Sequence, residues 1–314
     1  RSLRDECTLS LVASNDQTLA ATNIIDTGVK SLPGVVRTAA IYGANASGKS
    51  NLVRAMQLMR GVVMESASLQ LGQTFAVQPF KLDPTSATEP TELEITFLLK
   101  GVRYQYGFSF TPERIISEWL FVYRTAKAQR WFLREYDAQS DQDTYVFGSH
   151  LSGQRRIWQE ATKPNSLYLS TAVQLNSEQL KDVFAWISNH LVIFSNGSMP
   201  SFEYTVSHIL TNANHTVKDF LSETDISIDS ISIDRRKGFM QAFNMDLATG
   251  ELKNTREERD ISMPTFRHVT QNGSAIFELG DESEGTQKLF ALAGPLLDIF
   301  RNGRVLVVDE LDRS

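Results

Sequence analysis

Residues 43–50 form a glycine-rich segment whose residue types suit phosphate binding. They read Gly-Ala-Asn-Ala-Ser-Gly-Lys-Ser and match the pattern G-x-x-x-x-G-K-[ST] in full. Gly43 and Gly48 let the backbone curl so that its N–H groups face phosphate oxygens, and the N-terminus of a following helix adds about half a positive charge. Lys49 would then reach the β- and γ-phosphates, while the Ser50 hydroxyl would bind Mg²⁺. The segment predicts a nucleoside triphosphate site, whose residues are Gly43, Ala44, Asn45, Ala46, Ser47, Gly48, Lys49, Ser50 and Asn51.

Two carboxylates follow an apolar run near the other end of the chain. Val305–Val308 consists of four apolar residues, and Asp309 and Glu310 come directly after it. An all-apolar run is typical of a central parallel strand, and ligands of open α/β sheets bind beyond the C-terminal ends of such strands. We therefore expect Asp309 to hold Mg²⁺, through water, and Glu310 to be the general base that activates the attacking water.

A third motif lies just before the apolar run. Ser283, Glu284 and Gly285 precede a helical pattern that extends to about residue 302. A Ser-x-Gly at a helix N-terminus caps the helix, and it can also present a hydroxyl, backbone N–H groups and the helix dipole to an anion. A plain helix cap and an anion site are both open interpretations of this motif.

The first of these motifs needs a strand before it and a helix after it. Val35–Tyr42 is β-branched and apolar, which predicts a buried strand. After it, apolar residues recur at three- and four-residue spacing, which predicts an amphipathic helix that begins near Lys49. The expected unit is therefore strand, glycine-rich turn and helix.

The middle of the chain predicts three further regions. Apolar residues alternate between Thr91 and Tyr136, with a hairpin turn at Lys100-Gly101, so we expect an antiparallel sheet whose aromatic residues fill one buried face rather than stack on nucleobases. From 152 to 220 the pattern is helical, without the sustained heptads of coiled-coil arms. Residues 226–270 read as mixed strands and loops, and the charged stretch Lys253–Asp260 reads as a solvated loop.

Composition limits the classes of protein that the chain can belong to. Its 314 residues, 41% hydrophobic and 22% charged, leave room for about two globular domains. The single cysteine excludes an intrachain disulfide framework and a cysteine-based zinc site, and no apolar run is long enough to span a membrane. We expect a soluble, cytoplasmic protein with no membrane partner. The formal net charge of −6 argues against indiscriminate nucleic-acid binding but allows a local basic groove. Because the chain begins at Arg1 without a signal peptide and stops soon after an acidic pair, we expect a fragment trimmed at both ends.

The order of these motifs is similar to that of ABC-type ATPases. More narrowly, the chain resembles the SMC-like ABC ATPases of bacterial abortive-infection and phage-defence systems, the group that includes the ATPases of overcoming-lysogenization-defect-type systems. The residues that carry this resemblance are Ser2-Leu3-Arg4-Asp5-Glu6, Leu9-Ser10-Leu11, Tyr42–Leu52, Pro79-Phe80-Lys81-Leu82, Tyr104–Phe108, Glu118-Trp119-Leu120, Glu284-Gly285-Thr286 and Val308–Asp312. The resemblance implies an α/β fold: a P-loop NTPase of ABC type with a mixed sheet, an antiparallel β subdomain and a helical insert.

The resemblance also implies a division of the chain and further site residues. The phosphate-loop lobe with its β subdomain would be 1–150, the mainly helical insert and mixed region 151–280, and the returning core segment 281–314. Ser283 and Gly285 would complete the nucleotide site of a second subunit, and Asp312 would contact that subunit. Gln78 would sense Mg²⁺ and water, although a glutamine without a role is an equal alternative. Glu284 departs from the family pattern, which has glycine at this position.

Function stays open between hypotheses of different classes. The first is an ATP-hydrolysing, Mg²⁺-dependent ATPase whose nucleotide-driven homodimer, or higher homo-oligomer, controls an effector such as a Toprim-like nuclease in antiviral defence. The second is a DNA-repair or chromosome-organising ATPase that clamps DNA, and the third is a nucleotide-locked scaffold with little turnover. The absence of coiled-coil patterns and the acidic net charge favour the first, while nucleic acid stays open as a partner.

Overall fold

The computed structural model describes residues 5–16, 18–77, 89–195, 200–211, 215–224, 226–245 and 252–309. The chain divides into two compact units, residues 1–193 and 194–314, and each is described by itself. This boundary falls inside the segment 151–280, for which the family resemblance implies a mainly helical insert and a mixed region. No helix among the described residues is long and apolar enough to cross a membrane.

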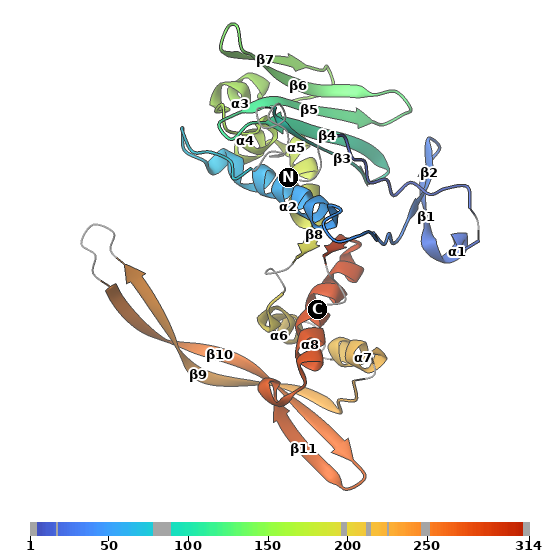
Figure 1. Cartoon of the computed structure of the whole chain (residues 1–314), viewed down its shortest axis with the longest axis vertical. Helices are drawn as coiled ribbons and strands as arrows, with labels where there is room; N and C mark the ends of the chain where they lie inside the picture. Colours follow the sequence, from blue (N-terminus) through green and yellow to red (C-terminus); the bar gives the residue numbers. More distant parts are fainter. Residues whose placement is uncertain are drawn as a thin grey trace. The chain divides into compact units, whose positions relative to one another are not determined.

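A five-stranded antiparallel sheet dominates the first unit (Figure 1). Its strands follow each other in chain order: β3 (Thr91–Leu99), β4 (Val102–Phe110), β5 (Ile115–Tyr123), β6 (Gln129–Asp137) and β7 (Gln142–Phe147). Lys100 and Gly101 both have positive φ in the β3–β4 turn, which confirms the predicted hairpin. The aromatic side chains of β4 at 104, 106, 108 and 110 are buried, as predicted for a core face.

Helices pack against this buried face. They are α3 (Arg155–Ala161), α4 (Tyr168–Gln174), α5 (Glu178–Ala185) and the π-helical turn η2 (Trp186–His190), which confirms the predicted helical texture. Phe97 of β3 stacks on Trp186 with ring centroids 4.1 Å apart. The predicted helix that begins at Lys49 is confirmed as α2 (Lys49–Glu65), which continues into the 3₁₀ turn η1 (Ser66–Ser68).

Hydrogen bonds tie α2 to this helical layer. The Arg60 guanidinium donates to the Ser188 carbonyl at 2.8 Å, and the Ser170 hydroxyl donates to the Val63 carbonyl at 2.6 Å. Val62 and Val63 are buried. The helix that follows the glycine-rich segment is therefore anchored along its C-terminal half.

The predicted strand Val35–Tyr42 is wrong over most of its length. After the short helix α1 (Ala20–Asn23), β1 (Ile24–Val29) and β2 (Leu32–Val36) form an antiparallel pair, so that only Val35 and Val36 are in a strand. Residues 38–44 have no regular structure, and the Tyr42 side chain is 91% exposed. The β-branched run pairs with its sequence neighbour, a partner that periodicity alone does not reveal.

The second unit combines a helical cluster with a long ribbon. Its helices are α6 (Phe202–Thr211), α7 (His215–Glu223) and α8 (Glu284–Asn302), followed by β12 (Val305–Val308). Its ribbon consists of β9 (Ser230–Met245) and β10 (Leu252–Thr270), to which β11 (Gly273–Glu278) adds a third strand; the 3₁₀ turn η3 (Leu279–Asp281) leads to α8. The strand β8 (Leu191–Phe194) carries the chain from the first unit into the second.

The ribbon corrects a second expectation. Every residue of Ser230–Met245 pairs with one of Leu252–Arg267, so the charged stretch Lys253–Asp260 lies in a strand and not in a loop. Away from its base the ribbon projects from α6–α8 (Figure 1). Residues 234–237 of β9 are all exposed, and consecutive exposed residues need no apolar alternation, which is the signal that the sequence pattern lacks.

A polar contact joins α6 to the middle of α8. Pro295 has no N–H, so the Ala291 carbonyl receives no helical hydrogen bond. The Thr205 hydroxyl donates to the Phe290 carbonyl at 2.8 Å and lies 3.1 Å from the Ala291 oxygen, and it accepts from the Gly294 N–H at 3.0 Å. The contact is close, because a Cβ at Gly294 would lie 2.7 Å from the Thr205 Cα. The helix tolerates its internal proline because a neighbouring helix replaces the missing bond.

Candidate functional site

The glycine-rich segment forms a turn at the N-terminus of α2. Gly48 is the N-cap residue of the helix and has a φ of 102°, a conformation that glycine adopts with little strain. At Gly43 a Cβ would lie 2.8 Å from the Ser47 hydroxyl, so a side chain there would crowd the turn. Both glycines therefore serve the turn as the sequence predicts, and the helix begins at Lys49 as expected.

The Lys49 side chain folds back over the glycine-rich turn. Its ammonium donates to the Gly43 carbonyl at 2.7 Å and to the Ala44 carbonyl at 2.9 Å. The side chain thus lies over the backbone that would surround a phosphate group. The first N–H groups of α2 are those that a helix leaves without intrahelical acceptors, and they add partial positive charge at the same place. Lys49 would exchange its two carbonyl partners for phosphate oxygens when a triphosphate binds.

Ser283 is the N-cap residue of α8. Its hydroxyl accepts a hydrogen bond from the Thr286 N–H at 3.1 Å and lies 2.9 Å from the Thr286 hydroxyl. Space is open around Gly285, where a Cβ would meet only the Ser283 hydroxyl at 3.8 Å. The capping role of Ser283 is confirmed, and the geometry leaves room for an anion beside the helix end.

The residue before the cap is held by a histidine from β10. Glu282 has a side chain only 9% exposed, and its Oε1 lies 2.7 Å from the His268 Nε2. Its backbone carbonyl accepts from the Gln287 side chain at 2.8 Å. His268 also packs edge-on against Phe277, with ring centroids 5.1 Å apart. His268 thus supports the segment that carries Ser283, a role that depends on the β10–β11 fold.

Asp309 directly follows β12, so the predicted strand is confirmed, whereas its predicted place in the centre of a larger sheet is not. The Asp309 N–H donates to the Phe194 carbonyl at 3.0 Å. The predicted site residues are divided between the two units. The first unit contains Gly43–Asn51, and the second contains Ser283, Gly285 and Asp309. Glu310, Asp312 and Gln78 lie outside the described residues.

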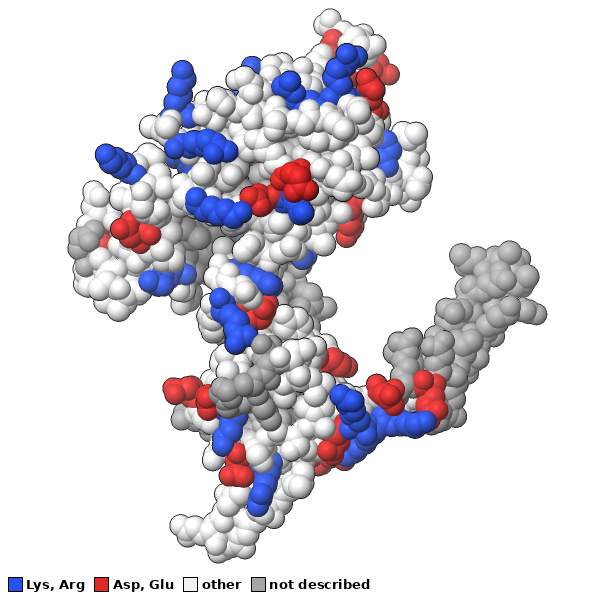
Figure 2. Space-filling view, turned by 180° about the vertical axis from the view of Figure 1, so that it is seen from behind, with Lys and Arg blue, Asp and Glu red and all other residues white. Residues whose placement is uncertain are grey.

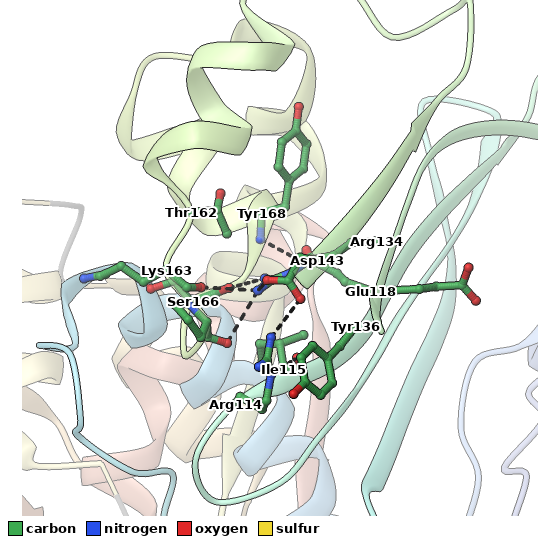
Figure 3. A network of polar contacts seen from close by, with 12 residues as sticks. Arg114, Ile115, Glu118, Arg134, Tyr136, Asp143, Thr162, Lys163, Ser166 and Tyr168 are labelled. Atoms are coloured by element: carbon green, nitrogen blue, oxygen red, sulfur yellow. Dashed lines mark hydrogen bonds and ion pairs between the residues drawn. The ribbon is translucent and has the colours of Figure 1, made fainter. Parts of the chain in front are cut away.

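A separate group of charged residues is buried behind the sheet (Figure 3). The Glu118 carboxylate accepts from the Tyr106 hydroxyl at 3.0 Å and from the Tyr168 and Leu169 N–H groups at 2.6 and 3.0 Å. Burial raises the pKa of Glu118, and the nearby Arg134 guanidinium opposes this rise. Glu118 is fully buried and receives the first N–H groups of α4, so its role is to fix α4 on the sheet.

Arg134 completes this buried group. Its guanidinium donates to the Ser166 carbonyl at 2.6 Å and forms an ion pair with Asp143 at 2.7 Å. Asp143 also pairs with Arg114 at 3.0 Å, and Arg114 lies 3.2 Å from the centroid of the Tyr136 ring. These contacts join β5, β6 and β7 to the loop before α4. No cluster of three or more His, Cys, Asp or Glu residues suited to a metal ion occurs among the residues that the structure describes.

Comparison with known families adds the deciding observation for the site. The family model described as "AAA domain, putative AbiEii toxin, Type IV TA system" matches residues 39–314, which include the turn at α2, the cap of α8 and Asp309. The chain belongs to this AAA family. In comparisons with curated proteins and with solved structures, nothing matches the chain.

Membership in this family indicates which ligand the predicted site residues would bind. The family is one of P-loop ATPases, which generally bind ATP with Mg²⁺. The mixed helix and strand structure is that of an α/β fold. We name the turn at residues 43–50 the P-loop, because it carries the P-loop sequence pattern. The donors also fit the ion, because hydroxyl and carboxylate oxygens such as those of Ser50 and Asp309 are the ligands that Mg²⁺ prefers.

Proposed function

We propose that this chain is an ABC-type ATPase of the SMC-like abortive-infection group, which hydrolyses ATP in a nucleotide-dependent homodimer or higher homo-oligomer. One observation carries the proposal: a P-loop turn whose lysine already lies over the phosphate-binding backbone, in a chain that belongs to an AAA family. The Ser-x-Gly cap of α8 supports the narrower assignment to the ABC type, because ABC enzymes use such a helix end in trans.

The residues divide the chemistry among themselves. Lys49 and the amides of the P-loop hold the β- and γ-phosphates, and Ser50 and Asp309 hold Mg²⁺, which neutralises phosphate charge when bound. Glu310 takes a proton from the water that attacks the γ-phosphorus, and the bond to the β–γ bridging oxygen breaks to leave ADP. Gln78 would sense this water, and Asp312 would contact the facing subunit.

Lys49→Ala tests the assignment of the P-loop. The turn keeps its amides but loses the ammonium that reaches the phosphates, so we expect ATP affinity to fall by at least tenfold in calorimetry with the intact protein. Arg54→Ala is the matched control, because Arg54 is the next cation along α2. Its guanidinium donates to the Asn51 side-chain oxygen at 3.2 Å. Equal ATP affinity of Lys49→Ala and Arg54→Ala would refute the proposal.

Glu310→Gln tests the base. The amide keeps the shape of the carboxylate but cannot accept the proton of water, so we expect ATP binding to persist while hydrolysis falls by about 10²-fold or more. The variant should also accumulate as a nucleotide-bound dimer in sedimentation. Hydrolysis at the wild-type rate would exclude Glu310 as the base.

Ser283→Arg separates an ABC-type engine from a P-loop enzyme that works alone. A bulky side chain at the α8 cap would block a facing subunit while leaving the P-loop of its own subunit intact. We expect monomer ATP affinity to persist and ATP-dependent association and hydrolysis to disappear. Ser283→Ala is the control for the cap alone, which costs about 1 kcal/mol of stability. If Ser283→Arg still associates and hydrolyses ATP, Ser283 is only a cap.

We further propose that association controls an effector, such as a Toprim-like nuclease, in antiviral defence. The description of the family as a putative AbiEii toxin supports a role in a defence system. Co-purification of the intact protein with the product of a neighbouring nuclease gene, with and without ATP, tests this idea. Nucleotide-independent pairing would favour a scaffold with little turnover, and DNA retention by the ATP-bound dimer would favour a DNA-clamping ATPase.

A further inference from the structure

The five-stranded sheet of the first unit carries aromatic residues on both of its faces. Along β5 the side chains of Glu118, Leu120 and Val122 are fully buried and face the helices. The alternate residues Trp119, Phe121 and Tyr123 are only partly buried, because the alternation of a strand turns them to the opposite face. Core packing therefore accounts for the first set of side chains but not for the second.

Two of these outer aromatics lie beside arginines. Arg103 pairs with Tyr123 across β4 and β5, and its guanidinium carbon lies 3.8 Å from the centroid of the tyrosine ring. Arg130 pairs with Phe121 across β5 and β6, at a bulge that turns Trp131 inward and leaves Arg130 exposed. The result is a row of flat π-faces and guanidinium planes at one end of the outer face.

Positive charge concentrates at this same end. The β5–β6 hairpin places Arg124 and Lys127 next to Arg130, and all three are exposed. None of them, nor Arg103, forms an ion pair with another residue that the structure describes. A shallow groove of about 390 Å³ runs between Lys127, Arg130 and His150. In the view of Figure 2, Lys and Arg side chains of the first unit are interspersed with Asp and Glu side chains.

The other end of the outer face differs in charge. Glu94 on β3 accepts hydrogen bonds from the Trp119 indole at 2.7 Å and from the Gln105 amide at 3.0 Å, and the Gln105 oxygen in turn accepts from the Tyr123 hydroxyl at 2.7 Å. A carboxylate at this position repels an anion, so Trp119 is excluded from the basic end. The combination of π-faces and unpaired cations is therefore confined to the ends of β4, β5 and β6.

We propose that this end of the outer face binds single-stranded nucleic acid. Unpaired bases would stack on the Phe121 ring and on the Arg103 guanidinium that covers Tyr123, while Arg124, Lys127 and Arg130 would contact backbone phosphates. A duplex keeps its bases stacked inside and offers only phosphates to such a surface, so the aromatic part of the site favours single strands. The site lies wholly in the first unit and does not depend on ATP binding.

The experiment measures binding of fluorescein-labelled oligonucleotides to the intact protein, without nucleotide, by fluorescence anisotropy. The probes are oligo-dT and oligo-U of about 15 nucleotides, a length near the upper site size of one small domain, and a DNA duplex of equal length. We expect saturable binding of at least one single strand, with weaker binding of the duplex, and a steep loss of affinity as salt rises. The preference between oligo-dT and oligo-U shows whether DNA or RNA is the better ligand.

Two matched variants make the test specific. Lys127→Glu should weaken binding about fivefold or more, whereas Lys30→Glu, the same change at an exposed lysine next to the β1–β2 turn, should leave binding unchanged. Phe121→Leu keeps an apolar side chain but removes the π-face, so affinity for the single strand should fall about fivefold to a hundredfold while the duplex is unaffected.

Three results would overturn the proposal. They are failure of both single strands to bind at low salt, equal loss of affinity in Lys127→Glu and Lys30→Glu, and wild-type affinity of Phe121→Leu in a folded protein. Lys49→Ala should lose ATP hydrolysis but bind the oligonucleotides as the wild type does. Failure of the nucleic-acid proposal can therefore be distinguished from failure of the ATPase proposal.

Discussion

Replacing Glu118 by glutamine should destabilise the first unit although the side chain keeps its size. The carboxylate is fully buried and receives three donors, two on Oε1 and one, the Tyr168 N–H, on Oε2. Glutamine can place its oxygen at the Oε1 position and keep the bonds from the Tyr106 hydroxyl and the Leu169 N–H. Its NH₂ group then faces the Tyr168 N–H, and two donors meet in a region without water.

The expected loss of stability in Glu118→Gln follows from the hydrogen bonds that the carboxylate makes. A buried N–H left without an acceptor costs about 1–3 kcal/mol, and the hydrogen bond that disappears is one to a charged group. Removing a buried charge offsets part of this cost, since burial raises the pKa of Glu118 and so disfavours the ionised form. We expect a net loss of about 2 kcal/mol in the free energy of unfolding near neutral pH.

Urea unfolding followed by tryptophan fluorescence measures this loss selectively. All four tryptophans of the chain, Trp119, Trp131, Trp158 and Trp186, lie in the first unit. With a slope of about 2 kcal/mol per molar urea, the midpoint should fall by about 1 M. The exposed Glu113, just before β5, gives the control Glu113→Gln, which should change stability by no more than about 0.5 kcal/mol. Equal midpoints for the two variants would contradict the reasoning.

Further predictions concern glycines, the helix contact and pH. Gly294→Ala should destabilise the second unit by about 1–3 kcal/mol, because the new Cβ would lie 2.7 Å from the Thr205 Cα. Gly61→Ala in α2 should instead stabilise the first unit by about 0.5–1 kcal/mol, because a Cβ there meets nothing within 4 Å. Thermal unfolding followed by circular dichroism compares the two variants. Thr205→Val should cost about 1–3 kcal/mol, since the Gly294 N–H and the carbonyls of Phe290 and Ala291 lose their partner, and proteolytic susceptibility of the second unit should rise with it. The raised pKa of Glu118 makes its stabilising contribution complete below its ordinary value of 4.5, and this contribution is lost as pH rises through the raised value. The difference in stability between wild type and Glu118→Gln should therefore shrink as pH rises above 4.5 in urea titrations.

Local signals predicted the elements that depend on local chemistry. The P-loop and helix α2 follow from the glycine positions and the apolar spacing after Lys49, and the Ser283 cap follows from the residue types at a helix start. The β3–β4 hairpin follows from strict alternation on both sides of Lys100-Gly101. Each of these features is specified by residues within about one helical turn or one hairpin of each other.

The features that the sequence did not predict depend on distant partners. The run 35–42 looks like a buried strand, yet its first residues pair with β1 and the rest has no regular structure. The support of Glu282 by His268 requires β10 to return beside η3, and the three donors on Glu118 come from β4 and α4. Hydrophobic period shows which face is buried, but it does not show which polar groups meet there.

The long ribbon is, in terms of topology, an insertion between two helices that are already joined. Thr205 on α6 and Gly294 on α8 meet directly, and the chain between these helices leaves the cluster and returns to it. The base of the ribbon belongs to the core, where Phe266 packs edge-on against Phe290 with ring centroids 5.1 Å apart. The pairs beyond Ile233 and Pro264 could be shortened two at a time, in register, without disturbing the contact between α6 and α8. The length of the ribbon can thus change without a change in the position of α8, the helix that carries Ser283.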